Sequence, residues 1–411
     1  MGPDLRRGYQ RGATRHHWHD RPRAPPGDAA QAGSVDEGLR GALTVDFTPT
    51  EEQQAVADLA EAILGDALDM ERHRAVEAAG GWFDRELWGT LAEAGLLGIA
   101  LDEDVGGAGL GAVALALLLR AQGNHVAPLP LLPSSVAALI VDRHGSDDQR
   151  QRLLPGVADG SRVLTVAVQE LLDDRLAEPA CSFRDGRLSG RKVVVEHLDA
   201  ASAFLVTAST PDGPRCVLVD ADAAGMTIIE DTSTRRQPLF DVTFDGTPGQ
   251  VLGEALGDGA GDPAAIGALL GHLLLGICAT QLGVTERALF MTAEYASTRE
   301  QFGRPIATFQ AVGQRLADQF VNVGGIRLAT LSAAWRLATG RDAAEELLVA
   351  KWWASERATD VANATQHCHG GVGVAADYPL HRYTLWNKHL TTSLGAGTQT
   401  LRHLGDLLAA G

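Results

Sequence analysis

Residues 295–310 read YASTREQFGRPIATFQ, and residues 366–398 read QHCHGGVGVAADYPLHRYTLWNKHLTTSLGAGT. The first stretch carries Arg299, and the second carries Gly370-Gly371. An arginine offers a planar, two-pronged donor to a phosphate group, and glycines let the backbone approach such a group closely. Taken alone, each feature is also typical of a helix end, where a surface arginine or a glycine cap is common. Only the pairing of the two stretches favours a ligand-binding role.

The sequence around both stretches has a helical pattern. From Pro263 to the end of the chain, apolar residues recur at the spacing of one helix face. Helices are predicted over 263–299, 309–339, 343–367, 379–390 and 398–409. We therefore expect a helical bundle over residues 259–411.

Residues 161–258 have a different texture. Short, mostly β-branched segments are separated there by Gly, Asp or Pro. The segments are 162–168, 182–188, 192–196, 202–208, 215–219, 226–229 and 240–244. This spacing of strands predicts a small antiparallel β domain.

Residues 45–160 are predicted to form a helical domain. Thr48 can cap a helix that begins at Pro49, and Glu51 can complete a capping box. Further helices are expected over 84–97, 110–122, 134–144 and 147–154. The glycine-rich loop 104–109 is interpreted as a turn and not as a nucleotide motif, because no strand precedes it.

Composition limits the function classes. The chain has 411 residues and a net charge of −17, with 45% hydrophobic and 21% charged residues, enough for a sizeable core. The acidic balance argues against nucleic acid as a partner, since duplex binding needs a positive surface. The four cysteines are sparse, which favours reduced thiols in a cytoplasmic protein. No uninterrupted apolar stretch reaches the roughly 20 residues of a membrane span, so none is predicted.

The two quoted stretches resemble the C-terminal domain of the acyl-CoA dehydrogenase family. The predicted order of helical domain, small antiparallel β domain and C-terminal four-helix bundle is that of the family's fold, which is mostly α with a central β domain. The resemblance implies an FAD-dependent oxidation of the Cα–Cβ bond of an acyl-CoA, with an electron-transfer flavoprotein or similar acceptor. In the family, an acidic residue just before the final Gly-Thr removes the α-proton. Here that place holds Ala396.

The same resemblance bears on residues 1–44. They carry Arg, His, Pro and Gly without an apolar run, and we interpret them as a disordered or mis-annotated N-terminal extension. Residues 45–53, VDFTPTEEQ, look like the usual start of a family member. Val45 is therefore a candidate for the true first residue.

Family members lend residues from one subunit to the FAD of its neighbour. The resemblance implies that an arginine contacts the pyrophosphate, and that a phenylalanine and a glycine-rich turn close over the adenine end. A threonine after the final glycine lies near the flavin. The corresponding residues here are Arg299, Gln301, Phe302, His367, Gly370, Gly371 and Thr398. His367 stands where the family usually has a glutamine, and Gln366 comes one residue early.

The residues that a family member uses for its own flavin ring are mostly replaced. Val194 stands at the place of a tryptophan, and Glu196 stands at the place of a threonine. The Gly-Ser-Asp stretch expected after Gln169-Glu170 is missing. Some relatives carry the base on the long helix instead, at a place that matches about Leu273, but no Asp or Glu lies between Pro263 and Thr285.

These departures predict a subunit without a base that completes the FAD site of a catalytic partner. The resemblance extends to the partner subunits of actinobacterial α2β2 acyl-CoA dehydrogenases that act on steroid side chains. One alternative is a homo-oligomeric flavoenzyme whose base has moved to His272 or Glu196. Another is a flavin-free structural homologue.

Two further groups allow competing interpretations. His367 and His369 flank Cys368, but this spacing does not match a zinc site, so no metal is predicted. Arg235-Arg236 could meet a phosphate of CoA, although solvated arginines explain the pair equally well.

Overall fold

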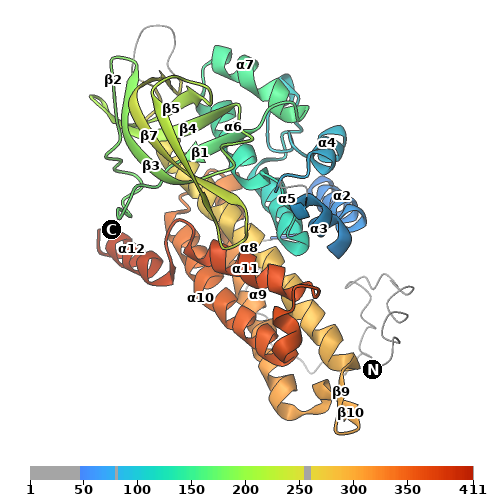
Figure 1. Cartoon of the computed structure of the whole chain (residues 1–411). Helices are drawn as coiled ribbons and strands as arrows, with labels where there is room; N and C mark the ends of the chain where they lie inside the picture. Colours follow the sequence, from blue (N-terminus) through green and yellow to red (C-terminus); the bar gives the residue numbers. More distant parts are fainter. Residues whose placement is uncertain (1–46, 79–81, 254–260, 411) are drawn as a thin grey trace, which may run out of the picture. The chain divides into compact units, whose positions relative to one another are not determined.

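The computed structural model describes residues 47–78, 82–253 and 261–410. The extension expected over residues 1–44 and the candidate start at Val45 lie outside the described residues. Within Phe47–Gly411, helices come first, a β-sheet follows, and a second group of helices ends the chain (Figure 1).

The first group of helices confirms the predicted helical segment. It contains α2 (Glu51–Ala67), α3 (Met70–Ala78), α4 (Arg85–Glu93), the short η1 (Glu103–Val105), α5 (Gly111–His125), α6 (Leu131–His144) and α7 (Asp147–Ala158).

The predicted cap of the first helix was wrong by two residues. Thr50, not Thr48, is the N-cap of α2, and its hydroxyl accepts from the backbone N–H of Gln53 at 3.2 Å. The Gln53 side chain accepts from the backbone N–H of Thr50 at 3.1 Å. The reciprocal pair needs Gln at the third helical position, which only a start at Glu51 provides.

The sheet holds eight strands in the part of the chain that the structure describes. They are β1 (Leu164–Ala167), β2 (Ser182–Arg184), β3 (Arg187–Glu196), β4 (Ala203–Thr210), β5 (Gly213–Asp220), β6 (Met226–Thr232), β7 (Pro238–Pro248) and β8 (Gln250–Val251). Their order is β6-β7-β3-β2-β4-β5-β8, and β1 pairs with β4. Most neighbours are antiparallel, while β1 and β2 pair with β4 in parallel.

One expected strand is a hairpin. The sequence predicted a single strand over 182–188, but β2 and β3 turn at Asp185-Gly186, where both residues have positive φ. Such a two-residue turn matches the twist of the flanking strands, and Asp-Gly is a favoured pair for it.

The C-terminal group confirms the predicted bundle. It contains α8 (Ala265–Thr298), α9 (Gln310–Ala338), α10 (Ala344–His369), α11 (Leu380–Thr392) and α12 (Gly397–Ala410). Between α8 and α9 lie a small hairpin, β9 (Glu300–Gln301) with β10 (Arg304–Pro305), and η2 (Ile306–Thr308). The turn η3 (Gly370–Val374) follows α10.

Helix α8 is the central element of the described chain. By length and composition α8 could cross a membrane, although the sequence predicted no membrane span. Within the fold, 78% of its apolar window is buried, as expected of a core helix. Helix α5 packs against it so closely that a Cβ at Gly123 would overlap the carbonyl oxygen of Thr280. A Cβ at Gly283 would likewise overlap the carbonyl oxygen of Arg120.

Candidate functional site

A cavity of about 50 Å³ lies where the sheet meets α6, α8 and the end of α11. Its volume has room for a few water molecules. It brings together Val194, Glu196 and Leu273, which come from distant parts of the sequence. These are three of the positions at which the sequence departs from the family pattern, and the fold brings them to one cavity.

Val194 has an unusual backbone at the edge of this cavity. Its φ is +55°, a conformation that a β-branched residue rarely adopts. The pairing of β3 with β7 shifts register between Lys192 and Val195, so Val194 sits in a bulge. A bulge redirects a side chain away from the regular alternation of a strand. The strand is thus bent at the position where the family resemblance leads us to expect a tryptophan.

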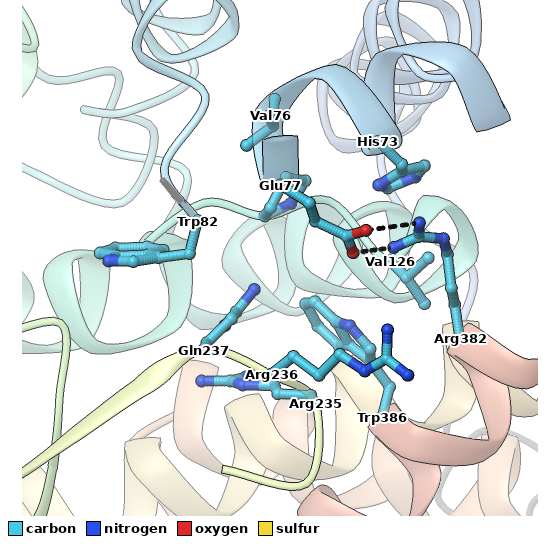
Figure 2. A pocket seen from close by; sticks show the side chains of 11 residues that line it. His73, Val76, Glu77, Trp82, Val126, Arg235, Arg236, Gln237, Arg382 and Trp386 are labelled. Carbon is cyan, nitrogen blue, oxygen red and sulfur yellow. Dashed lines mark hydrogen bonds and ion pairs between the residues drawn. The ribbon is translucent and has the colours of Figure 1, made fainter. Parts of the chain in front are cut away.

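Glu196 is held by Arg235 and His389. One carboxylate oxygen accepts from Arg235 at 2.6 Å, and the other contacts Nε2 of His389 at 2.7 Å. Burial alone would raise the pKa of this carboxyl, but the charge of Arg235 and the hydrogen bond from His389 hold it well below the ordinary range. Glu196 therefore stays ionised, and a carboxylate with such a low pKa is a poor proton acceptor. Arg235 also lines a second pocket behind this ion pair (Figure 2).

Glu170 and Lys192 are engaged in a structural pair. The Lys192 ammonium is fully buried and donates to Glu170 at 2.7 Å and to the hydroxyl of Thr207 at 2.9 Å. Glu170 also accepts from the backbone N–H groups of Ala180 and Cys181. These bonds join β3 and β4 to the loop before β2, so the pair holds the β domain together.

His272 neighbours Leu273 in sequence but does not line the cavity. Its Nδ1 donates to the carbonyl of Ala268 at 2.7 Å, and its Nε2 lies 3.3 Å from Arg143. Burial lowers the pKa of His272 to about 4. The ring is neutral near pH 7 and its free nitrogen faces a guanidinium, which suits a core residue better than a base.

Ala396 lies just before α12. Its carbonyl accepts from the backbone and hydroxyl of Thr400, and its N–H donates to Gln399, so the backbone caps the helix. Thr398 is exposed in the first turn of this helix. A carboxylate that the sequence analysis missed also reaches this region: Glu356 of α10 lies against Gly397.

The outer motif stands on the surface. Arg299, Gln301 and Phe302 belong to the end of α8 and the β9–β10 hairpin, and all three are exposed. Phe302, at the hairpin turn, is 91% exposed and has a φ of +55°. A large aromatic side chain in this position gains nothing from the chain's own core, which is typical of a contact to another molecule.

A stack of rings ties the outer motif to the glycine turn. Tyr295 of α8 stacks on His369 at the end of α10, with ring centroids 4.3 Å apart. His369 in turn accepts from the hydroxyl of Tyr378 at 2.9 Å. The sequence analysis treated His369 only as a doubtful metal ligand. The structure instead places it where it joins residues 295–310 to residues 366–398 at one end of the bundle.

The glycine turn presents His367 and not Gln366. The Gln366 amide folds back, donates to the carbonyl of Gly370 at 3.1 Å and packs against Gly373. His367 is exposed, as are Gly370 and Gly371. No atom of the described residues would meet a Cβ at either glycine within 4 Å, so this surface is open to a ligand or a partner.

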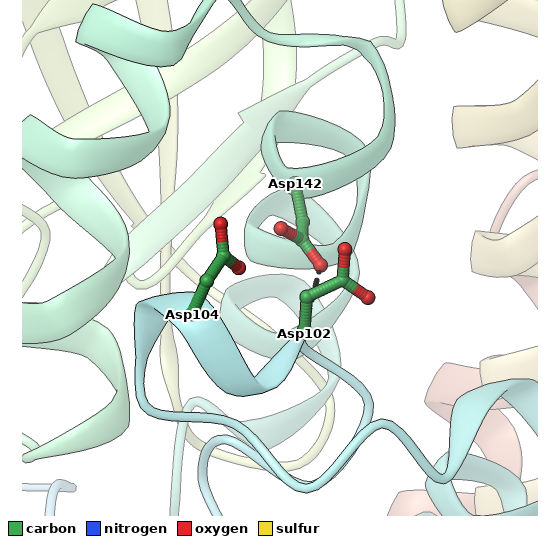
Figure 3. A group of neighbouring side chains, drawn as sticks. All are labelled: Asp102, Asp104 and Asp142. Carbon is green, nitrogen blue, oxygen red and sulfur yellow. Dashed lines mark hydrogen bonds between the residues drawn. The ribbon is translucent and has the colours of Figure 1, made fainter.

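An acidic trio is the strongest metal-like cluster in the described residues. Asp102, Asp104 and Asp142 gather beside η1 (Figure 3). The Arg150 guanidinium lies 2.9 Å from both Asp104 and Asp142 and 3.4 Å from Asp102. Asp142 also accepts from the backbone N–H of Asp102 at 2.9 Å. Arg150 thus occupies the place of a cation, and the trio is explained as an ion-pair network.

Family models and similar proteins agree on the identity of the fold. Residues 50–161 match the acyl-CoA dehydrogenase N-terminal domain, and residues 259–406 match the acyl-CoA dehydrogenase C-terminal domain. Acyl-CoA dehydrogenase FadE27 of Mycobacterium tuberculosis is 38% identical over 374 residues, covering 89% of this chain and 99% of the relative. The chain belongs to the acyl-CoA dehydrogenase family.

Two solved structures are similar to this family member over nearly their whole length. A variant of the Tcur3481-Tcur3483 steroid ACAD matches at 45% identity and a TM-score of 0.83, covering 89% of this chain and 99% of that one. The ChsE4-ChsE5 complex from Mycobacterium tuberculosis matches at 37% identity and a TM-score of 0.83, covering 89% and 100%. The family resemblance read from the sequence is thus confirmed, as is its fold.

Proposed function

We propose that this chain is the base-deficient subunit of a heteromeric acyl-CoA dehydrogenase and completes the FAD site of a catalytic partner subunit. The complex desaturates a CoA thioester with a bulky, steroid-derived acyl group. It works in the cytoplasm and passes electrons to an electron-transfer flavoprotein or a similar acceptor. The observation that carries the proposal is the contrast between an exposed outer motif, which keeps Arg299, Phe302 and the glycine turn, and an inner cavity without a competent base.

The outer residues suit the ADP end of FAD. The exposed Arg299 guanidinium can donate twice to a pyrophosphate, and Phe302 offers an exposed ring to the adenine. The open backbone at Gly370 and Gly371 permits close approach. All four face away from the chain's own core, as residues lent to a partner must.

The inner cavity does not suit the ring end. FAD, when bound, supplies the acceptor for the hydride that leaves Cβ of the thioester. Glu196 is ionised and has no proton to donate where the family resemblance expects a neutral donor. Val194 offers no aromatic face. We infer that the ring belongs to the partner subunit.

Proton abstraction also falls to the partner. A base must lie beside the thioester, and the two family positions for it hold Ala396 and Leu273, which cannot accept a proton. The relocated bases considered from the sequence fit poorly. The pKa of Glu196 lies well below its ordinary range, which makes it a weak base. His272 lies outside the cavity, and its free nitrogen faces Arg143.

Helix α9 supports assembly with another subunit. Phe320, Val321 and Leu328 recur at helical spacing on this helix, and each is more than half exposed. Exposed apolar side chains that gather on one helix face are typical of a protein interface. The similar ChsE4-ChsE5 structure is a complex of two named proteins, which makes a partner subunit the preferred occupant.

The test is Arg299→Ala in the chain co-expressed with its catalytic partner. We expect the co-purified complex to lose most of its bound flavin while the subunits remain associated. Arg184→Ala is the matched control, because Arg184 is also an exposed arginine but lies on β2, at the other end of the described fold (Figure 1). The control should keep its full flavin content.

Two outcomes separate the alternatives. If the complex with Arg299→Ala keeps all of its flavin, the chain is a flavin-free structural homologue or contacts FAD elsewhere. If the isolated chain turns over an acyl-CoA and His272→Ala abolishes that turnover, the chain is a complete enzyme with a relocated base.

A further inference from the structure

A second pocket lies on the far side of the Glu196–Arg235 ion pair. It has a volume of about 40 Å³ and is lined by residues from α3, from the turn between β6 and β7, and from α11. Three arginines border it: Arg235 and Arg236 from the turn, and Arg382 from α11 (Figure 2). Arginine side chains of separate elements repel one another unless a negative charge lies between them.

The three arginines differ in how well they are neutralised. Arg382 pairs with Glu77, and Arg235 pairs with Glu196. The side chain of Arg236 makes no hydrogen bond or ion pair with any described residue. Two carboxylates therefore face three guanidinium groups, and the pocket carries an excess of one positive charge.

Buried polar atoms without partners gather at the same place. Nε of Arg235 and Nε of Arg382 are buried donors with no acceptor, and Oε1 of Gln237 is a buried acceptor with no donor. Arg235 is among the buried charged residues of the fold, with its side chain 4% exposed. A buried donor left without an acceptor is costly, so two such donors beside one cavity need an explanation.

The aromatic walls make the site selective. Trp82 and Trp386 line the pocket, and the Arg235 guanidinium lies over the Trp386 ring at 5.1 Å from its centroid. The ring fixes the plane of the guanidinium and keeps water from one of its faces. An anion that enters the pocket therefore meets a pre-oriented donor.

We propose that this pocket binds a phosphate group, held by the guanidinium groups of Arg235, Arg236 and Arg382. A phosphate in this pocket can accept from the guanidinium groups that line it and can neutralise Arg236. Hydrogen phosphate also carries an O–H group that can donate to Oε1 of Gln237. A carboxylate ligand has no such O–H group. The site is separate from the FAD contacts and from the inner cavity.

A ligand in this pocket can affect the inner cavity through the ion pair between Arg235 and Glu196. Arg235 lines the phosphate pocket and also donates to Glu196 from a terminal nitrogen at 2.6 Å. Glu196 in turn lines the inner cavity. A phosphate bound to Arg235 competes with Glu196 for the same guanidinium. Phosphate binding therefore weakens the ion pair between Arg235 and Glu196.

Isothermal titration of inorganic phosphate into the full-length chain, at constant ionic strength set with chloride, tests the proposal. Wild type should bind phosphate, and Arg236→Gln should bind about fivefold more weakly, which is the size expected when one partly exposed charge is removed. Glu77→Gln should bind more tightly, because it frees Arg382 from its carboxylate. Arg184→Gln is the control and should match wild type.

Parallel titrations with glycerol 3-phosphate and acetate identify the source of the group. Binding of both phosphates means that the pocket accepts a phosphate carried on a small molecule, and binding of inorganic phosphate alone means a free ion. Either result supports the proposal if Arg236→Gln weakens it. The proposal is overturned if chloride or acetate competes as well as phosphate, or if Arg236→Gln and Glu77→Gln both bind as wild type does.

Discussion

At the scale of single residues, buried ion pairs stabilise the fold, and the spacing of charged residues along the sequence did not predict them. Glu196, read from the sequence as a departure from the ring site, is the centre of an ion network with Arg235 and His389. These three residues come from β3, the β6–β7 turn and α11, so the network joins the β domain to the bundle.

We predict that Glu196→Gln destabilises the chain. The substitution leaves Arg235 buried without its carboxylate, and breaking one side of a buried ion pair costs about 3 kcal/mol or more. Urea unfolding of the isolated chain measures the change. Glu230→Gln, an exposed site on β6, is the control and should change the unfolding free energy by less than about 0.5 kcal/mol. Equal stability of the two variants would contradict the network.

Three histidines give the fold a defined response to acid. Burial lowers the pKa of His73 to about 4, of His197 to about 3 and of His272 to about 4, all below the ordinary value of 6.5. Between pH 6.5 and about 4 the unfolded chain therefore binds more protons than the folded chain, and stability falls as the pH falls.

Denaturant unfolding at several pH values checks this response. Each histidine should contribute a loss of about 1.4 kcal/mol per pH unit within that window. The variant His272→Gln should show a shallower slope than wild type by one such contribution. A stability that stays constant from pH 7 to pH 5 would mean that these rings titrate normally.

At the scale of elements, the contact between α5 and α8 sets the core. Gly123 and Gly283 let the two backbones meet, because a Cβ on either glycine would overlap a carbonyl oxygen of the other helix. Neither glycine was singled out from the sequence, since a glycine within a helical pattern predicts only a local loss of helix propensity.

Two alanine substitutions in α8 should therefore have opposite effects. Gly283→Ala forces the helices apart and should cost about 1–3 kcal/mol. Gly267→Ala, where a Cβ would meet nothing within 4 Å, should stabilise the chain by up to about 1 kcal/mol, because alanine favours the helix. Thermal unfolding of both variants gives the comparison. A stable Gly283→Ala variant would show that the helices have room to separate.

Elements were predictable where periodicity alone decides them. The long helices α8, α9 and α10 agree with the expected ranges to within a few residues, because their apolar faces are regular. The hairpin of β2 and β3 and the parallel pairs with β4 were not predicted. Those features depend on which strands meet in space, and the spacing of strands along a chain does not contain that information.

At the scale of the whole molecule, the candidate site divides into a part that the sequence predicted and a part that it did not. The quoted stretches predicted the glycine turn and the residues of the outer motif, but not the β9–β10 hairpin that carries Gln301. The ring stack of Tyr295 on His369 explains why the two stretches lie together. The pairing of Glu196 with Arg235 could not be predicted from the sequence, because the two residues are 39 positions apart and meet only in the fold.

Assembly gives a further prediction at this scale. Leu328→Glu on the exposed face of α9 places a charge in the proposed subunit contact, while the isolated chain should fold normally since this side chain is exposed. Size-exclusion chromatography of the co-expressed pair should show loss of the complex. An intact complex would show that the subunits meet through another face. Lys388→Glu, at an exposed site on α11, is the control.

The flavin content of the chain, purified alone and then with its catalytic partner, tests the central claim most directly. We predict a colourless isolated chain and a yellow complex with about half a flavin per polypeptide, because each FAD would need both subunit types. A yellow isolated chain with one flavin each would contradict the account, since it would place a complete ring site around Val194 and Glu196.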